Sequence, residues 1–263
     1  HRFMQLSLEG KNALVCGASK GIGWASAFEL AQLGANITLV ARNSTALIEK
    51  LQLLPKTGNQ SHDFLVLDLA DLDATRAAVN AVVLRKQYQI LINNSGGPAG
   101  GPIIAADPQD FLNTFNQHVL SAQVLTQAIV EGMKSAGYGR IINVISTSVK
   151  EPILGLGVSN TIRGAMGNWA KTMAMELGQY GITVNNVLPG YTYTDRLQEI
   201  IGKKGSDPEQ KAEVIREMES HVPLRRLGDP AEIGAAVAFL ASPAAAYISG
   251  INLPVDGGRT RSL

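Results

Sequence analysis

The chain has 263 residues, of which 45% are hydrophobic and 17% are charged, and its formal net charge is +1. This length and apolar content predict one large α/β domain with a well-buried core. A balanced charge without runs of like sign argues against a nucleic-acid partner. The single cysteine, Cys16, excludes an internal disulfide and a cysteine-based metal cluster, so we expect no metal site.

The sequence shows no pattern of a membrane or secretory segment. No apolar run reaches the roughly 18–20 residues of a membrane span, and the N-terminus lacks the apolar core of a signal peptide. We therefore expect a cytoplasmic protein that has no membrane partner. The residues His1-Arg2-Phe3 before Met4 are interpreted as the remnant of a tag, which leaves residues 5–263 as a single domain.

Short apolar runs alternate with amphipathic segments along the chain. The strand-like runs are 13–15, 37–40, 64–67, 90–92, 140–144, 183–188 and 251–255. The segments with helical spacing are 21–33, 44–54, 71–86, 107–135, 158–179 and 229–241. Nearly continuous apolar runs are typical of parallel strands that are covered on both faces. The pattern therefore predicts a single Rossmann-type, doubly wound α/β fold, with a mainly parallel sheet of about seven strands and helices on both faces.

One polar stretch, residues 191–221, interrupts this alternation directly after the run 183–188. It is either a surface insertion or a mobile lid over a site at the carboxyl ends of the strands. We favour the substrate lid, because long loops at that edge of a parallel sheet are often functional.

A glycine-rich turn separates the first strand from the first helix. The turn contains Gly17, Ser19, Lys20, Gly21, Ile22 and Gly23. Glycines let the backbone turn sharply and approach a ligand closely. The free N–H groups at the start of the following helix favour a diphosphate. The turn therefore predicts a dinucleotide site.

The residue after the second strand bears on which dinucleotide binds. Arg42 lies 25 residues after Gly17, where a dinucleotide fold places an acid for a ribose 2′-hydroxyl or a base for a 2′-phosphate. No acid stands there, Arg42 can bind phosphate in a bidentate fashion, and Lys20 adds a second positive charge. Unless both are ordinary solvated surface charges, these residues favour NADP(H) over NAD(H).

Polar residues also follow the third and fourth strands. Asp68, next to Leu69, either accepts a hydrogen bond from an adenine amine or caps the next helix. Asn93 either lies beside the cofactor or joins two strands, and Ser95 and Gly96 follow it. The first alternative in each case adds these residues to the predicted dinucleotide site.

Six motifs occur in order along almost the whole chain. They are Gly17-x-x-x-Gly21-Ile22-Gly23, Asn93-Asn94-Ser95-Gly96, Gly139-Arg140-Ile141-Ile142-Asn143, Asn185-Asn186-Val187-Leu188-Pro189-Gly190, Pro223-Leu224-Arg225-Arg226 and Val255-Asp256-Gly257-Gly258. With these motifs the sequence resembles the short-chain dehydrogenase/reductase family, in particular its 3-oxoacyl-carrier-protein reductases.

The resemblance implies roles for several residues. Pro189, Gly190 and Thr194 would line the nicotinamide ring, Asp68 and Leu69 would frame the adenine, and Asn93 would lie by the cofactor ribose. It also implies a small-molecule carbonyl or alcohol substrate. A homotetramer or homodimer, joined through the long helices and the C-terminal segment, is implied as well.

The resemblance fails at the catalytic residues. Members of the family usually reduce a carbonyl with a Ser and a Tyr-x-x-x-Lys, supported by an Asn on an earlier helix, but no Tyr-x-x-x-Lys occurs in this chain. Matched to the family pattern, the Tyr and Lys positions fall on Ser159 and Arg163. The Ser position falls on Ser146 and the Asn position on His118.

These replacements change the chemistry that is available. A serine hydroxyl is a far weaker acid than a phenol, so Ser159 is a poor proton donor. Arg163 stays charged and cannot relay a proton, although it can hold the nicotinamide ribose and stabilise an alkoxide. His118, Tyr191, Tyr193 or water would then supply the proton. Alternatively, His118 is neutral and bonded to a backbone carbonyl, and the tyrosines pack within residues 191–221.

Three functions follow from this pattern. The first is an NAD(P)-dependent oxidoreductase with an atypical active site, which reduces a ketone with NADPH. The second is a catalytically impaired dinucleotide-binding protein, a sensor or scaffold. The third is a non-redox, lyase-type reaction on the same fold. We favour the first, because Pro189, Gly190 and Thr194, expected around the reactive ring, are all present.

Overall fold

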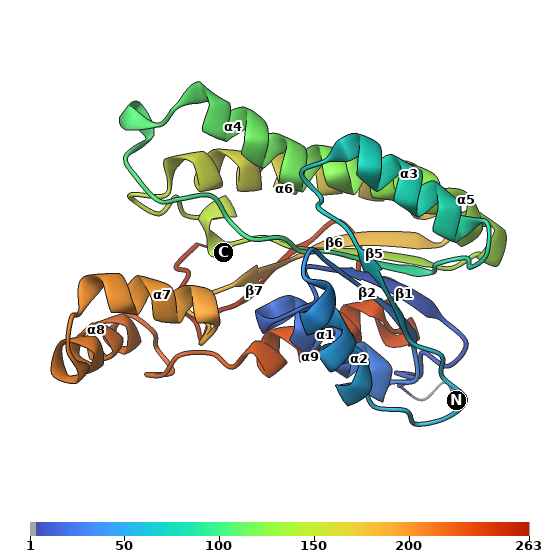
Figure 1. Ribbon diagram of the computed structural model, residues 1–263, viewed down its shortest axis with the longest axis horizontal. Coiled ribbons are helices and arrows are strands. Elements are labelled where there is room, and N and C mark those ends of the chain that lie inside the picture. The colour runs from blue at the N-terminus through green and yellow to red at the C-terminus, as the bar shows by residue number, and fades with distance from the viewer. Residues whose placement is uncertain (1–3, 263) are drawn as a thin grey trace.

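The computed structural model describes residues 4–262, and Figure 1 shows its arrangement. The tag interpretation concerns residues 1–3, which lie outside the described residues, as does residue 263.

A single seven-stranded sheet runs through the molecule in the order β3-β2-β1-β4-β5-β6-β7. The strands are β1 (Asn12–Cys16), β2 (Asn36–Ala41), β3 (Asp63–Val66), β4 (Ile90–Asn93), β5 (Gly139–Val144), β6 (Ile182–Pro189) and β7 (Asn252–Val255). Every neighbouring pair is parallel. This arrangement confirms the doubly wound α/β fold that the sequence predicts.

Helices cover both faces of the sheet. They are α1 (Gly21–Gln32), α2 (Ser44–Leu53), α3 (Leu72–Val83), α4 (Pro108–Phe115), α5 (Ser121–Ala136), α6 (Gly157–Leu177), α7 (Asp195–Lys204), α8 (Pro208–Ser220) and α9 (Pro230–Ala241). In Figure 1, α1, α2 and α9 lie below the sheet, whereas α3, α4, α5 and α6 lie above it. None of these helices in the described part of the chain combines the length and hydropathy that a membrane crossing requires.

The continuous apolar runs have a simple explanation, which β1 illustrates. Successive side chains of a strand point to opposite faces of the sheet. Ala13 and Val15 pack into the core under α1 and α9, whereas Leu14 and Cys16 pack into the core under α5 and α6. Because both faces are covered, every position of such a strand is buried, and no polar alternation appears in the sequence.

The helix predicted at 107–135 is divided in two by a wider turn. Asp107 caps α4 by accepting a hydrogen bond from the backbone N–H of Gln109, with Pro108 as the first helical residue. After α4 the backbone forms one π-helical turn, Asn116–Leu120, and then continues as α5. Such turns occur frequently at functional sites, and this one carries His118.

The insertion predicted at 191–221 consists of two helices, α7 and α8, and not of an irregular loop. Leu197, Ile201 and Met218 form a small apolar core between them. A parallel bridge joins Thr192, near the start of the segment, to Gly228, which lies beyond its end and before α9. Movement of this helical pair as a lid stays a prediction.

Four asparagines stand in register across β4, β5, β6 and β7. The side-chain amide of Asn93 donates to Asn143, that of Asn143 to Asn186, and that of Asn186 to Asn252, each at 2.8 Å between Nδ2 and Oδ1. This asparagine ladder shows that the Asn93 side chain joins strands, the second of the two roles considered for it.

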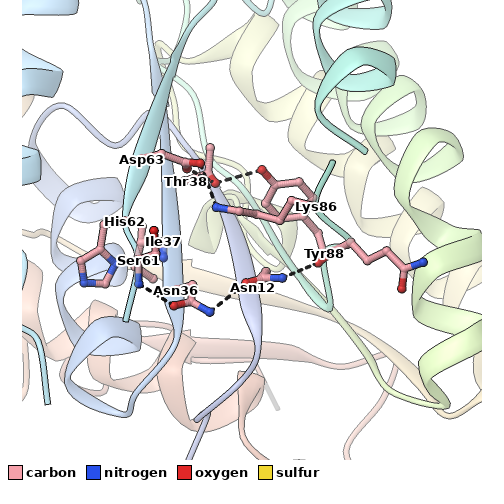
Figure 2. Close-up of polar contacts among 10 residues, drawn as sticks. Asn12, Asn36, Ile37, Thr38, Ser61, His62, Asp63, Lys86 and Tyr88 are labelled. Atoms are coloured by element: carbon pink, nitrogen blue, oxygen red, sulfur yellow. Dashed lines mark hydrogen bonds and ion pairs between the residues drawn. The ribbon is translucent and has the colours of Figure 1, made fainter. Parts of the chain in front are cut away.

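A separate polar network holds the amino ends of β1, β2 and β3 together (Figure 2). Asn36 Nδ2 donates to Asn12 Oδ1 at 2.9 Å, and the Thr38 hydroxyl hydrogen-bonds to both Asp63 and the phenol of Tyr88. Because Asn12 and Asn36 begin their strands, this network lies at the edge of the sheet opposite the carboxyl ends.

The asparagine ladder predicts a specific pattern of stability loss. We expect Asn143→Ala to lower the free energy of unfolding by about 2–4 kcal/mol, because the amide of Asn93 and the carbonyl of Asn186 both lose a buried partner. Urea unfolding measures this change. Asn252→Ala, at the exposed end of the ladder, is the matched control and should cost less than about 1 kcal/mol. Equal losses in the two variants would contradict the ladder's role.

Candidate functional site

A cleft of about 650 Å³ opens at the carboxyl ends of the strands. It lies where the strand order reverses, between β1 and β4, and it receives residues from the loops that follow β1 to β6. In open parallel sheets ligands bind at this switch point, and the volume is typical of pockets for small molecules.

Most residues predicted to bind a cofactor line this cleft. They are Gly17, Ser19, Lys20, Gly21, Ile22, Arg42, Asp68, Leu69, Ser95, Gly96, Arg163, Pro189, Gly190 and Thr194. The structure does not place Gly23 or Asn93 on the lining, since Gly23 is buried and Asn93 belongs to the ladder. The lining also includes Asn94, Asp195 and Arg196, for which the sequence analysis gave no role.

The glycine turn has no room for side chains. A Cβ on Gly17, whose φ is +61°, would lie 2.6 Å from Asn94 Nδ2, and a Cβ on Gly23 would collide with the carbonyl oxygen of Gly17. Helix α1 begins at Gly21 without a side-chain cap, so its first N–H groups face the cleft without an internal partner. The backbone of this turn therefore suits a close-lying anion such as a diphosphate.

Asn94 connects the turn to the loop after β4. Its side-chain Nδ2 donates to the carbonyl oxygens of Cys16 and Gly17, at 3.3 and 3.4 Å. The consecutive pair Asn93-Asn94 is the sequence signal that could have predicted this role of Asn94. Two consecutive asparagines at the end of a strand point to opposite sides, so Asn93 reaches the ladder and Asn94 reaches the glycine turn.

Charged residues lie at the end of the cleft that the loops after β1, β2 and β3 form. Lys20 and Arg42 are both exposed on its lining, after β1 and β2 respectively. The carboxylate of Asp68 accepts a hydrogen bond from the N–H of Ala70, whereas Asp71 caps α3. Asp68 therefore does not cap the helix, and its exposed carboxylate stays on the lining.

Arg163 is a buried cation at the other end of the cleft. Only 8% of its surface is exposed, and its Nη1 donates to the carbonyl oxygen of Val144 at 3.1 Å. Burial lowers the pKa of its guanidinium to about 10, so the group stays charged at neutral pH. No carboxylate among residues 4–262 forms a salt bridge with it. A buried charge without a protein counter-ion can bind a ligand's negative charge strongly.

His118 lies next to Arg163 and is neutral. Its Nε2 lies 3.0 Å from the carbonyl oxygen of Gly96 and its Nδ1 3.2 Å from the hydroxyl of Ser95. Because a carbonyl only accepts, Nε2 carries the proton and donates it to Gly96. Burial, followed by the charge of Arg163, lowers the pKa of the imidazole to about 3. This geometry matches the alternative of a neutral histidine bonded to a backbone carbonyl.

The two catalytic serine candidates do not line the cleft. Ser146 Oγ accepts a hydrogen bond from the N–H of Ser148 at 3.1 Å, which leaves its own hydrogen free to donate. Ser159 lies in the first turn of α6, one helical turn before Arg163 and on the same face of the helix. The structure brings His118 and Arg163 together on a small second cavity, but it does not bring the serines there.

None of the six tyrosines, all of which lie within residues 4–262, lines the cleft. Tyr191 accepts a hydrogen bond from Arg259 Nη2 at 3.3 Å, and the Arg259 guanidinium lies 4.4 Å from the centre of its ring. Tyr193 is half exposed and lines a separate shallow cavity beside α1 and the start of α9. In the described structure the cleft therefore contains no phenol that could act as an acid.

Comparison with known proteins identifies the family. The profile of the enoyl-(acyl carrier protein) reductase family matches residues 17–260. A 3-oxoacyl-[acyl-carrier-protein] reductase of Pseudomonas aeruginosa is 34% identical over 256 residues, which cover 96% of this chain and 98% of that protein. The chain belongs to the short-chain dehydrogenase/reductase family.

Solved structures of reductases have the same fold as this family member. L-sorbose reductase from Gluconobacter frateurii, complexed with NADPH and L-sorbose, is 28% identical with a TM-score of 0.93, and the match covers 99% of this chain and 100% of that one. Actinorhodin polyketide ketoreductase with NADPH is 27% identical with a TM-score of 0.87, covering 96% and 98% of the two chains.

The lowered pKa of His118 predicts how the stability of the protein depends on pH. The unfolded histidine binds a proton as the pH falls through about 6.5, whereas the native one resists protonation down to about 3. Native stability therefore falls as the pH decreases through this window, by up to about 1.4 kcal/mol per pH unit. We expect His118→Asn and His118→Ala both to remove this contribution, as measured by urea unfolding at a series of pH values.

The two variants should differ at neutral pH. Asparagine can still donate to the Gly96 carbonyl, whereas alanine leaves that carbonyl without its partner and should cost about 1–3 kcal/mol more. An unchanged pH dependence in both variants would show that His118 titrates normally in the native protein.

Proposed function

We propose that this member of the family is an NADP(H)-dependent oxidoreductase that reduces a ketone and uses Arg163, in place of an acidic tyrosine, at the reacting oxygen. One observation carries the proposal: a buried, charged Arg163 without a protein counter-ion lines the cleft, while no tyrosine of the described chain does so. The family and the reductases similar to this chain support the reaction class.

The cleft residues fit a phosphorylated nicotinamide dinucleotide. The close-packed glycine turn and the open start of α1 suit the diphosphate. Arg42 and Lys20 provide the positive charge that a ribose 2′-phosphate requires, and no acid follows β2 to prefer a free 2′-hydroxyl. Two structures similar to this chain contain NADPH, which supports NADP(H) over NAD(H).

NADPH, when bound, supplies a hydride to the carbonyl carbon of the substrate. The guanidinium of Arg163 stabilises the negative charge that develops on the carbonyl oxygen, in a partly desolvated site where such charge stabilisation is large. Ser146 and Ser159 do not line the cleft, so the proposal gives them no contact with the reacting oxygen. Arg163 cannot release a proton at neutral pH, so water protonates the alkoxide.

His118 acts as a positioning residue in this proposal. Its hydrogen bonds to Ser95 and Gly96 hold the loop after β4, which forms one wall of the cleft. Since the imidazole is neutral, it adds no second positive charge beside Arg163.

A second candidate function is a dinucleotide-binding protein without turnover. It is favoured by the position of Ser146 and Ser159, which do not line the cleft, together with the absence of a cleft tyrosine in residues 4–262. The two candidates share cofactor binding and differ only in hydride transfer, so kinetics distinguishes them.

Arg42 tests the choice of cofactor. We expect Arg42→Ala to weaken NADPH binding by about tenfold or more, because a charge-assisted bond to phosphate contributes roughly 1.5–3 kcal/mol. NADH binding, which involves no 2′-phosphate, should change less than about twofold. Calorimetric titration with both nucleotides measures the ratio. Equal losses for the two nucleotides would contradict a 2′-phosphate site at Arg42.

Arg163 tests the reaction. We expect Arg163→Gln to lower kcat for ketone reduction by about 10²–10³-fold, the usual effect of removing a donor to a developing oxyanion. Loss of NADPH absorbance with a panel of ketones measures the rate. Arg216→Gln, an exposed arginine on α8, is the matched control and should leave the rate unchanged. Full activity in Arg163→Gln would refute the proposed role.

A combined variant separates the two candidate functions. Ser159→Tyr together with Arg163→Lys restores the family's usual Tyr-x-x-x-Lys on the same helix face. If the wild type binds NADPH but reduces no ketone, whereas the double variant does so, the protein is a binding protein that lacks only its acid. Turnover in the wild type that disappears in Arg163→Gln supports the reductase.

A further inference from the structure

The first turn of α7 spans the cleft and contacts both of its walls. Asp195 Oδ2 lies 3.5 Å from Lys20 Nζ, which belongs to the glycine turn. The next residue, Arg196, donates from Nη2 to the carbonyl oxygen of Pro98 at 3.1 Å, in the loop after β4. Both Asp195 and Arg196 line the cleft.

Local structure holds this turn in place. Thr194 begins α7 by accepting a hydrogen bond from the N–H of Leu197 at 3.3 Å. The side chain of Leu197 is buried in the small core between α7 and α8. Asp195 is therefore fixed between a cap and a core residue, and Arg196 ties the same turn to the opposite wall.

We propose that Asp195 competes with a phosphate group of the cofactor for Lys20, and so limits the affinity of the cleft for dinucleotides. The inference rests on the proposed function, since it requires that the cleft binds a phosphorylated cofactor. The ammonium group of Lys20 is a compact charge that prefers an anion within hydrogen-bond distance. In the present structure the nearest such anion is the carboxylate of Asp195.

The charges on the lining explain why this competition matters. The Asp195 carboxylate and a cofactor phosphate at the glycine turn would both pair with the Lys20 ammonium, so the phosphate must displace the carboxylate to use Lys20 fully. When the cofactor leaves, the carboxylate of Asp195 pairs with Lys20 again, because the first turn of α7 keeps the two side chains close together. The pair therefore lowers the affinity for the cofactor and eases its release.

The expected effect is small and depends on salt. The side chains of Lys20 and Asp195 are 65% and 59% exposed, and exposed ion pairs are worth little. Removing the carboxylate should therefore tighten cofactor binding by about two- to fivefold at low ionic strength. High ionic strength screens exposed charges, so the gain should shrink there.

The experiment measures NADPH and NADH affinity by calorimetry for the wild type, Asp195→Asn, Lys20→Gln and the double variant. Glu217→Gln is the matched control, because it removes an exposed carboxylate of α8 that does not line the cleft. Asparagine has nearly the same shape as aspartate, and unfolding curves check that the variants remain folded.

Asp195→Asn should tighten NADPH binding, Glu217→Gln should not, and Asp195→Asn should give no gain in the Lys20→Gln background. A gain for NADPH alone assigns Lys20 to the 2′-phosphate, and an equal gain for NADH assigns it to the diphosphate; both support the competition. An unchanged affinity in Asp195→Asn, or a gain that persists without Lys20, overturns it. A wild type that binds neither nucleotide overturns the proposed function as well.

Discussion

The contact between the glycine turn and Asn94 is the constraint on which the site depends. Gly17 and Gly23 approach each other and the Asn94 amide so closely that a side chain on either glycine would collide with its neighbours. This approach brings the start of α1 against β1 and the loop after β4, and the cleft opens at that junction. The positions of Arg42, Asp68 and the β6 loop follow from the parallel sheet, because all its carboxyl ends meet at one edge.

The sequence predicted the sheet well because its strands are buried on both faces, and burial of that kind leaves continuous apolar runs. It did not predict α7 and α8, because their apolar residues, such as Leu197 and Ile201, serve a small local core in an otherwise polar stretch. The π-helical turn at 116–120 was also missed, since a single wide turn leaves the helical spacing on each side intact. The family resemblance gave Arg163 and His118 as candidate site residues, and the charge of Arg163 followed from its chemistry, but the burial of both side chains and the hydrogen bonds of His118 required the three-dimensional structure.

At the proposed catalytic end, the charge of Arg163 helps to keep His118 neutral. Both side chains are buried, and two positive charges so close together would repel each other without solvent to screen them. In the structure the arginine is charged and the histidine is neutral, and the N–H of the histidine donates a hydrogen bond to the backbone carbonyl of Gly96. In the proposed function, this fixed positive charge takes the place of a proton donor at the reacting oxygen.

The helical pair α7–α8 has its own small core, and the bridge between Thr192 and Gly228 closes its base. The pair also contacts the rest of the protein at the first turn of α7, through Asp195 to Lys20 and through Arg196 to Pro98. Within the pair, the residues that line the cleft belong to this first turn of α7, and none belongs to α8. Substitutions on the exposed face of α8 therefore change the exterior of the protein and leave the lining of the cleft as it is.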